Sequence, residues 1–461
     1  MPVNCELEFG RESLRLRLPD GADVLAMKGG APLADPGRTV RESLARPVAG
    51  PGLAELARAR RGAGAPLTAA VVISDNTRPV PYRGADGILE PILEILRAGR
   101  VERIVILVAN GTHRALADSE LRAMLCPAAF APGVEVVNHV CTDRASLKLL
   151  GRTARGTDAW INRIYAEAGL KILTGLVEPH FIAGASGGPK AVCPGLVGED
   201  VTRVFHGPAL LADPRSTSLR LDDNPCQDEA RAVAAMAGSD FIVNVTLDGA
   251  RRVTGVFSGE LGAAHAAAVG HLLAVAGVPF EREYDLVVTH AGFVGVNHYQ
   301  TAKAAVEGVK AVRPGGRLVI AANHTEAEPV GSANYRRALR CLAESGPEGL
   351  VRKMLAPGWE FIPEQWQAQL WAQSLAKLGT PANLTYCSPR LTGEAFRAAG
   401  LPGTDGGDGL ASAAGASARD LAEAMVQRAV DRFAAASPGG RVAVLADGPY
   451  GVPVPAKGER P

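Results

Sequence analysis

Short runs of consecutive apolar residues recur along the chain and alternate with longer segments of helical periodicity. A short apolar run bounded by turn residues is typical of a strand buried on both faces. Such runs occupy residues 69–73, 104–109, 134–138, 172–177, 241–245, 286–289, 318–322 and 442–445. Helical patterns lie between many of them, at residues 87–97, 158–168, 262–276 and 301–312. Strands that alternate with helices predict an α/β fold with mostly parallel sheets.

The alternation restarts near residue 284, after the segment GVPFERE, which indicates a domain boundary around residue 280. The chain has 461 residues. At about 150 residues per domain, this length gives an expectation of two or three domains. Residues 400–417 are rich in Gly, Ala and Ser. This composition predicts a flexible loop, with a short Ala-rich helix as the alternative.

Composition and charge exclude several classes of protein. Hydrophobic residues make up 47% and charged residues 21%, so the chain is not wholly disordered. Lys and Arg total 49 against 48 Asp and Glu, and this net charge of +1 favours neither nucleic acid nor a membrane as partner. The seven Cys form no C-x-x-C pair, which indicates a reducing, cytoplasmic location. The N-terminus has charges where a signal peptide is apolar, and no apolar stretch reaches the ~18 residues of a membrane span.

Polar motifs follow three of the predicted strands. SDNTRP supplies Asp75 and Arg78, NGTHR supplies His113, and EPH supplies His180. Ligands of parallel sheets bind beyond the carboxyl ends of strands, so we expect the three motifs to gather. The planar fork of an Arg matches a carboxylate or a phosphate with two bonds. An ordinary surface turn with a capping Ser or Asp is the alternative for SDNTRP.

A Gly-rich loop, GASGGPK, ends in Lys190. Backbone N–H groups of such a loop, which contains Ser186, Gly187 and Gly188, can surround a phosphate, and the Lys adds positive charge. The spacing matches neither the Walker A motif nor G-x-G-x-x-G. An ordinary turn is the alternative.

Three His residues stand out because they lie in loop-like or post-strand contexts: His113, His180 and His206. Neutral imidazole binds nickel or zinc and also transfers protons near neutral pH, and the spacing does not say which His does which. The other six His residues lack a comparable motif. Structural roles are expected for His139, His265, His271 and His324, and His290 and His298 are intermediate.

Two further segments carry candidate residues in the second half of the chain. NHYQTAK places Tyr299, Gln300 and Lys303 close together, and the last two share a face if the segment is helical. A solvated helix start is the alternative. PEQWQAQLW contains Trp366, whose indole can cover a flat heteroaromatic ring or pack in a core.

Together these motifs resemble the lactate racemase family, enzymes built around a nickel-pincer nucleotide. The match runs in order through SDNTRP, NGTHR, EPHFIAGASGGPKAVCPG, His206, YQTAK and the Trp366–Gln367 pair, and it covers most of the chain. The segment from EPH to Lys190, followed by His206, is its most specific part.

The resemblance implies roles for the candidates of the first half. Lys190 carries the nickel-pincer nucleotide through an amide-type (thioamide) bond, within the loop of Ser186, Gly187 and Gly188. His206 ligates the nickel, and His113 and His180 are paired acid/base groups. Asp75 and Arg78 form the active-site turn that binds substrate, with Arg78 on the substrate carboxylate.

The resemblance also implies how the domains share the work. The N-terminal domain, residues 1–280 with a tail at 441–461 that returns to it through residues 441–455, holds the cofactor. The C-terminal α/β domain, residues 281–440, contributes Tyr299, Gln300 and Lys303 to substrate and Trp366 to the cofactor. The active site then lies in the cleft between the two domains.

The chemistry agrees with racemisation or epimerisation of a 2-hydroxy acid. Removal of hydride from C2 gives a planar 2-keto acid, to which hydride can return on either face. The hydroxyl loses its proton as hydride leaves, and the two enantiomers place that hydroxyl differently, so two His bases are more natural than one. The expected partners are a small 2-hydroxy acid, whose side chain stays open, and the cofactor-synthesis enzymes.

Three other functions fit the sequence less well. A nicotinamide-dependent oxidoreductase predicts a Rossmann fingerprint, which the sequence lacks. A non-catalytic cofactor-binding protein does not need His113, His180 and Arg78 together. A zinc hydrolase is weaker still, because the sequence has no H-E-x-x-H arrangement.

Overall fold

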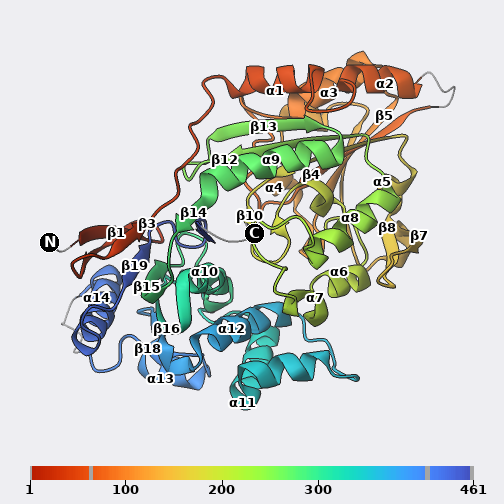
Figure 1. The fold of residues 1–461 in the computed structure, drawn as a ribbon. Coiled ribbons are helices and arrows are strands. Elements are labelled where there is room, and N and C mark those ends of the chain that lie inside the picture. Colours follow the sequence, from red (N-terminus) through yellow and green to blue (C-terminus); the bar gives the residue numbers. More distant parts are fainter. Residues whose placement is uncertain (1–2, 62–65, 411–415, 457–461) are drawn as a thin grey trace. The chain divides into compact units, whose positions relative to one another are not determined.

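The computed structural model describes residues 3–61, 66–410 and 416–456 (Figure 1). It divides into two compact units. The central unit comprises residues 29–210 and 215–275, apart from the undescribed 62–65. The terminal unit comprises the described residues of 1–28, 211–214 and 276–461. Each unit has its own sheet.

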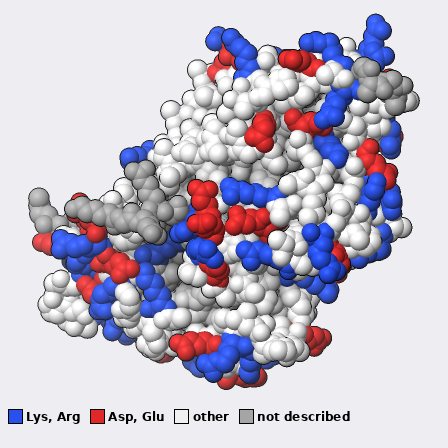
Figure 2. Space-filling view, turned by 45° about the vertical axis from the view of Figure 1, so that its right-hand side comes forward, with Lys and Arg blue, Asp and Glu red and all other residues white. Residues whose placement is uncertain are grey.

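Charged side chains of both signs are intermixed over the face shown in Figure 2. This mixture agrees with the net charge of +1. In the part of the chain that the structure describes, every helix is too short or too polar to cross a membrane.

The central unit is built on a six-stranded sheet with the order β13-β12-β9-β4-β5-β6. Its strands are β4 (Thr68–Ser74), β5 (Arg103–Ala109), β6 (Val134–Asn138), β9 (Leu170–Leu176), β12 (Phe241–Leu247) and β13 (Val253–Gly259). Neighbours are parallel except β12 and β13, which are antiparallel. The chain extends the sheet first on one side of β4 and then on the other. Such a reversal of strand order is where open α/β sheets bind ligands.

Helices cover the central sheet because its strands are apolar on both faces. Alternate residues such as Val71, Ile106 and Val243 share a core with Val40 and Leu93 of the helices on one face. Those helices are α1 (Pro36–Ala45), α2 (Leu53–Arg61) and α3 (Leu89–Ala98). Figure 1 shows α9 (Leu261–Ala276) on the opposite side of the sheet from them.

Shorter elements complete the central unit. They are α4 (Asp118–Met124), β7 (Leu147–Arg152), β8 (Asp158–Asn162), α5 (Arg163–Glu167), β10 (Pro179–His180), β11 (Gly184–Ala185), the 3-10 turn η3 (Gly188–Ala191), α6 (Glu199–Phe205) and α8 (Pro225–Ala237). A further short helix, α7 (Pro208–Ala212), has residues assigned to each of the two units.

The terminal unit has a six-stranded parallel sheet with the order β18-β17-β16-β15-β19-β3. Its strands are β3 (Asp23–Leu25), β15 (Tyr284–His290), β16 (Val312–Ala321), β17 (Leu384–Cys387), β18 (Thr404–Asp405) and β19 (Val442–Leu445). A hairpin of β1 (Val3–Phe9) and β2 (Glu12–Leu18) and a pair of β14 (Gly277–Phe280) and β20 (Val452–Pro455) accompany it. The helices are α10 (His298–Ala311), α11 (Ala333–Leu355), α12 (Gln365–Leu378), α13 (Gly393–Ala398) and α14 (Ala418–Ala436).

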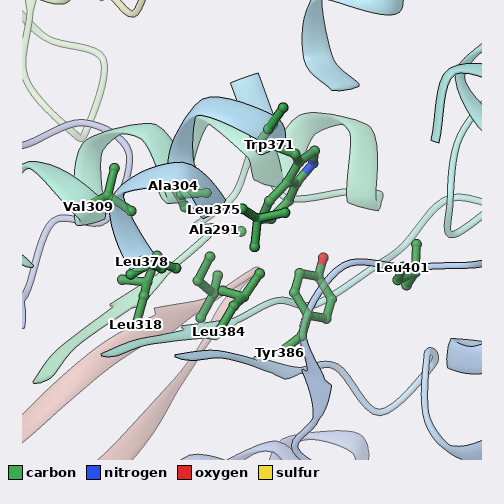
Figure 3. Close-up of a cluster of buried hydrophobic side chains, with 14 of the residues drawn as sticks. Ala291, Ala304, Val309, Leu318, Trp371, Leu375, Leu378, Leu384, Tyr386 and Leu401 are labelled. Atoms are coloured by element: carbon green, nitrogen blue, oxygen red, sulfur yellow. The ribbon is translucent and has the colours of Figure 1, made fainter. Parts of the chain in front are cut away.

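The two faces of the terminal sheet build two separate cores. Leu318, Leu384 and Tyr386 face Trp371 and Leu375 of α12, as Figure 3 shows. The alternate residues of the same strands, such as Val288 and Val319, pack against α14 and the β1–β2 hairpin. Successive side chains of a strand point to opposite faces of the sheet, so a strand buried on both faces contributes apolar side chains to both cores.

The eight strands predicted from apolar runs are all present, and three of the four predicted helices are present as α3, α9 and α10. The prediction of a helix at residues 158–168 is wrong over its first half. Residues Asp158–Asn162 form β8, which pairs with β7, and only α5 follows as a helix. In the segment predicted as a loop or a short helix, residues 404–405 form β18, and residues 411–415 lie outside the described residues.

The two units differ from the predicted domains in where the N-terminal and C-terminal segments of the chain belong. The break after residue 275 lies close to the predicted boundary at 280. Residues 441–455 pair with both predicted domains: β19 lies between β15 and β3, and β20 pairs with β14, of which β3 and β14 fall within the predicted residues 1–280. Residues 3–28 also belong to the terminal unit. The physical reason is that the apolar run Val442–Leu445 is fully buried between two strands of that sheet.

Candidate active site

Three polar motifs meet at one edge of the central sheet. β4 lies between β9 and β5, and SDNTRP, EPH and NGTHR come at or just after the ends of these three strands. The strands end at Ser74, Leu176 and Ala109. The expectation that the motifs gather at the carboxyl ends of neighbouring strands is confirmed.

His113 and Asp75 form a hydrogen-bonded pair at this edge. His113 Nδ1 donates to Asp75 Oδ2 at 2.6 Å, and Thr77 donates to Asp75 Oδ1 from its backbone N–H and its hydroxyl. Burial alone would raise the pKa of Asp75, but the hydrogen bonds from His113 and Thr77 outweigh it and hold this pKa below its ordinary value. An ionised Asp75 keeps the proton of His113 on Nδ1 and leaves Nε2 as an acceptor. The family resemblance predicts that Asp75 binds substrate. In the structure, its two carboxylate oxygens accept hydrogen bonds from His113 and Thr77.

Arg78, the candidate for a substrate carboxylate, faces a carboxylate of its own chain. Its Nη1 lies 3.1 Å from Oε1 of Glu178, and the two side chains are 31% and 38% exposed. The backbone of Glu178 is fixed, because its N–H donates to Ser186 Oγ and its carbonyl accepts from the Ser186 N–H. The Arg78 guanidinium is therefore placed where it can bind a carboxylate.

His180 is buried at the end of β10, where it pairs with Gly184 of β11. Its Nδ1 accepts hydrogen bonds from the backbone N–H groups of Ala183 at 3.2 Å and Ile182 at 3.4 Å. Asn224 holds this turn from outside, since its Nδ2 donates to the Ile182 carbonyl at 2.9 Å. The side chain of His180 is thus oriented by backbone groups of its own hairpin.

The Gly-rich loop is held by two buried side chains from distant elements. Asn244 of β12 accepts from the Gly188 N–H at 3.0 Å, and His265 of α9 donates from Nε2 to the Ser186 carbonyl at 3.0 Å. Burial lowers the pKa of His265 to about 4, so it binds as a neutral donor. A Cβ on Gly188 would lie 2.4 Å from Cγ of His265, and one on Gly187 would lie 2.7 Å from Val177. Both glycines also have positive φ, so the loop needs Gly at these positions.

Lys190 follows these glycines in an apolar setting. Its Nζ lies 4.5 Å from the centre of the Phe205 ring. Burial, reinforced by the positive charge of Arg78, lowers the pKa of Lys190 to about 7. A large share of its amine is therefore neutral and nucleophilic near neutral pH, unlike a surface Lys.

His206 lies on the same aromatic ring as Lys190. It caps the C-terminal end of α6, and its ring meets Phe205 edge-on with centroids 4.9 Å apart. Burial and then the charge of Lys190 lower the pKa of His206 to about 3. The imidazole is therefore neutral, which is the form that binds a metal ion.

Comparisons with known proteins agree with this site. Residues 9–218, which include every candidate of the central unit, match the family described as the lactate racemase N-terminal domain. The lactate racemase of Thermoanaerobacterium thermosaccharolyticum is 28% identical over 81% of this chain and 86% of its own. That of Lactiplantibacillus plantarum is 31% identical over 73% of this chain and 77% of its own. The chain belongs to the lactate racemase family.

Solved structures extend the likeness to nearly the whole chain. The lactate racemase apoprotein of Thermoanaerobacterium thermosaccharolyticum superposes with a TM-score of 0.80, at 25% identity over 98% of this chain and 100% of that chain. A protein from Thermotoga maritima, with a TM-score of 0.61 and 16% identity over 92% and 99%, shares the fold. As a member of the lactate racemase family, the chain is a racemase, and therefore an isomerase.

The other candidates of this lactate racemase family member lie in the terminal unit. Trp366, on α12, donates from Nε1 to the Tyr299 hydroxyl of α10 at 3.0 Å, so the structure brings these two residues together. The α10 helix begins with Asn297 as cap, whose side chain accepts from the Gln300 N–H. Lys303 lies one turn further, on the same face as Gln300.

Sequence reasoning missed Glu178, Asn224, Asn244 and His265 of the central unit. His265 was assigned a structural role, and the structure shows that this role is to hold the loop of Lys190. A signal was present, because a His within the apolar helix LGAAHAAAVGHLL needs a buried hydrogen-bond partner. Asn244, in the buried strand FIVNVTL, carried the same signal.

Proposed function

We propose that this protein racemises or epimerises a 2-hydroxy acid at C2, and that lactate is the first substrate to test. The observation that carries the proposal is the His113–Asp75 pair beside Arg78 on one sheet edge, with Lys190 and His206 meeting at Phe205. The relatives named lactate racemase support it. A 2-hydroxy acid needs a base for its hydroxyl, which the acceptor Nε2 of His113 supplies, and a partner for its carboxylate, which the two-bond fork of Arg78 supplies.

The residues fit a nickel-pincer nucleotide attached at Lys190. The lowered pKa of Lys190 suits an amide-type (thioamide) bond, and the neutral imidazole of His206 suits nickel. In the described ranges, His, Cys, Asp and Glu side chains nowhere gather in threes that could hold a metal ion. A nickel at His206 would therefore take its other ligands from the bound nucleotide. Ser186, Gly187 and Gly188 shape the loop that presents Lys190.

When bound, the nucleotide supplies the acceptor and donor of hydride. Arg78 binds the carboxylate of the substrate, which fixes C1 while the other substituents of C2 exchange places. His113 takes the hydroxyl proton on Nε2 as hydride leaves C2, and Asp75 stabilises the imidazolium. The proton returns from His113 when hydride returns to the same face of C2. Return to the opposite face draws the proton from His180 instead, and exchange with water restores the protonation of both histidines, so protons and electrons balance. His180 is the second acid/base candidate. Tyr299, Gln300 and Lys303 remain candidates for substrate binding, and Trp366 for the cofactor.

The test of the activity is a substrate screen. Protein produced together with the cofactor-synthesis enzymes and nickel is incubated with single enantiomers of lactate, malate, aryl-lactates and sugar acids. Chiral chromatography then measures the opposite enantiomer or epimer. Conversion of a single enantiomer or epimer of one of these acids to an equilibrium mixture, lost in His113→Ala, supports the proposal. A protein that carries nickel and nucleotide but converts none of these acids contradicts it.

The test of the cofactor site needs no turnover. Intact mass and peptide mapping should place a nucleotide adduct on Lys190, absent from Lys190→Ala and present in Lys148→Ala, which changes a Lys paired at the surface with Glu167. His206→Ala should keep the adduct and lose nickel. An adduct that survives Lys190→Ala, or full nickel content in His206→Ala, would refute these assignments.

A further inference from the structure

The central sheet loses a pair of its main-chain ladders where two of the polar motifs begin. β4 and β9 pair only as far as Val72 and Leu173, although the two strands continue to Ser74 and Leu176. Over these last residues β4 pairs with β5, and β9 pairs with β12. β4 then leads into SDNTRP and β9 into EPH. Side chains, rather than main-chain hydrogen bonds, therefore connect β4 to β9 at this edge.

The connection is a relay of hydrogen bonds through Tyr82 and Thr174. The Tyr82 hydroxyl accepts from the Ser74 N–H at 2.7 Å and lies 2.9 Å from Thr174 Oγ1. Thr174 donates its single hydroxyl proton to the Val72 carbonyl at 2.7 Å, so Tyr82 is the donor to Thr174. Tyr82 is 1% exposed, and burial raises its pKa, so the hydroxyl keeps the proton that this relay requires.

The β4 end of the Tyr82 relay lies next to the base. Ser74 directly precedes Asp75, which accepts the Nδ1–H of His113 at 2.6 Å. A hydrogen bond this short depends strongly on where the Asp75 backbone lies. The Ser74 N–H, held by the Tyr82 hydroxyl, therefore helps to place the carboxylate that orients His113.

The β9 end of the Tyr82 relay lies next to the Gly-rich loop. Thr174 directly precedes Gly175, and a Cβ on Gly175 would lie 3.5 Å from Gly187 Cα and 3.9 Å from Ser74 Oγ. The loop that presents Lys190 thus packs on β9 at the place where Ser74 approaches it. The distance between β4 and β9 here sets the distance between the base and that loop.

We propose that Tyr82 is a positioning residue, whose hydroxyl fixes Asp75, and through it His113, relative to the loop of Lys190. Tyr82 is buried and its hydroxyl is bonded to Ser74 and Thr174, so it acts through these partners. Without this hydroxyl the Ser74 N–H loses its acceptor, and the end of β4 can shift to find another. The inference rests on the proposed function, in which His113 takes the hydroxyl proton of the substrate.

Spectra of the full-length apoprotein test the placing of His113 without cofactor or substrate. Wild type, Tyr82→Phe and Tyr165→Phe are labelled with 15N-histidine, and long-range 1H–15N correlations at pH 7 give the 15N shifts of Nδ1 and Nε2, assigned with His113→Gln. Tyr165 is the matched control, because it is equally buried and its hydroxyl donates to the Gly238 carbonyl at 2.7 Å. We expect the two His113 shifts to move toward each other in Tyr82→Phe, as its tautomers mix, and to stay unchanged in Tyr165→Phe. Unchanged shifts in a folded Tyr82→Phe overturn the proposal.

Kinetics of the cofactor-loaded enzyme test the effect on turnover. Tyr82→Phe should lower kcat at least ~10-fold and change KM less than ~3-fold, because Arg78 still binds the substrate carboxylate. Tyr165→Phe should lose Tm to a similar extent and keep kcat within ~2-fold. Thr174→Ser keeps the relay and should keep kcat, whereas Thr174→Val should resemble Tyr82→Phe. The double variant Tyr82→Phe/Thr174→Val should be within ~3-fold of Tyr82→Phe, because both changes break the same relay.

The control variants decide between positioning and a purely structural role. Equal kcat in Tyr82→Phe and Tyr165→Phe, with Tm lowered in both, shows a structural hydroxyl and overturns the proposal. If Tyr82→Phe does not fold, equal kcat in Thr174→Ser and Thr174→Val overturns it, and a loss confined to Thr174→Val supports it. If the wild-type enzyme converts no 2-hydroxy acid, the proposed function fails, and the 15N shifts of His113 alone decide whether Tyr82 positions it.

Discussion

His113 Nδ1 and Asp75 Oδ2 lie 2.6 Å apart although 38 positions separate the two residues in the chain. The pair forms because β4 and β5 are neighbours in the sheet and each motif begins where its strand ends. Both carboxylate oxygens of Asp75 accept hydrogen bonds from its own chain. In the proposed function, we expect Asp75 to act through His113, as a positioning residue that fixes the tautomer of the imidazole and stabilises its charged form.

Asp75→Asn should leave the fold intact and lower kcat by at least ~10-fold, equivalent to about 1.4 kcal/mol. The amide can donate to Nδ1, and this would move the proton of His113 to Nε2, where the acceptor is needed. Chiral assay of kcat and KM, with 15N spectra of His113, measures both effects. Asp118→Asn, an exposed carboxylate on α4, is the control. An unchanged kcat in Asp75→Asn would contradict the proposal that Asp75 positions His113.

Glu178→Gln should lower KM for the hydroxy acid by about 3- to 10-fold with little change in kcat. The reason is that Glu178 competes with the substrate carboxylate for the fork of Arg78. Arg78→Lys keeps the charge and loses the fork, so kcat/KM should fall by at least ~10-fold. Initial rates over a range of substrate concentrations give both values. A higher KM in Glu178→Gln would mean that Glu178 orients Arg78 instead of competing for it.

Gly188→Ala should destabilise the protein by roughly 2 kcal/mol or more and prevent attachment at Lys190. Its φ of 49° is unfavourable for Ala, and the new Cβ would lie 2.4 Å from the ring of His265. Thermal unfolding and intact mass are the measurements. Gly249→Ala, whose Cβ meets nothing within 4 Å, should stay within about 0.5 kcal/mol of the wild type. A Gly188→Ala protein with normal Tm and a full adduct would contradict this account of the loop.

The sequence predicts the strands and the gathering of the motifs well, because both depend on local pattern and on one general property of parallel sheets. Apolar runs such as residues 69–73 and 104–109 are strands because both of their faces are buried. The helix at 158–168 failed because pairing with β7 decides the structure of Trp160 and Ile161, and a short apolar pattern does not contain that information.

The supports of the site could not be predicted, since their partners are far away in the chain. Asn244 is 56 positions from Gly188, and His265 is 79 positions from Ser186. Their residue types only indicate that some partner exists. The orientation of His180 depends on the backbone N–H groups of its own turn, at distances that only the folded hairpin sets.

Lys190→Met should raise the Tm of the apoprotein, and more so at pH 6 than at pH 9. The folded pKa of about 7 lies below the ordinary value of 10.5 for Lys, so the unfolded state binds more protons between these values. The free energy of unfolding contributed by this group therefore rises from about pH 7 to about pH 10 and is lowest below pH 7, where the folded state must bury a charged amine. Met removes that cost while it keeps a long apolar side chain against Phe205.

Thermal unfolding of Lys190→Met at the two pH values should show a gain in Tm of ~2 °C or more at pH 6, equivalent to roughly 1 kcal/mol for a unit of this size, and a smaller gain at pH 9. Lys148→Met, at a surface ion pair with Glu167, should show no such pH dependence. If the cofactor is attached at Lys190 as proposed, the amine becomes an uncharged amide, and a gain should also appear in the loaded wild-type protein. A Tm difference between Lys190→Met and wild type that is equal at both pH values would show that Lys190 is not a buried, destabilised cation in the apoprotein.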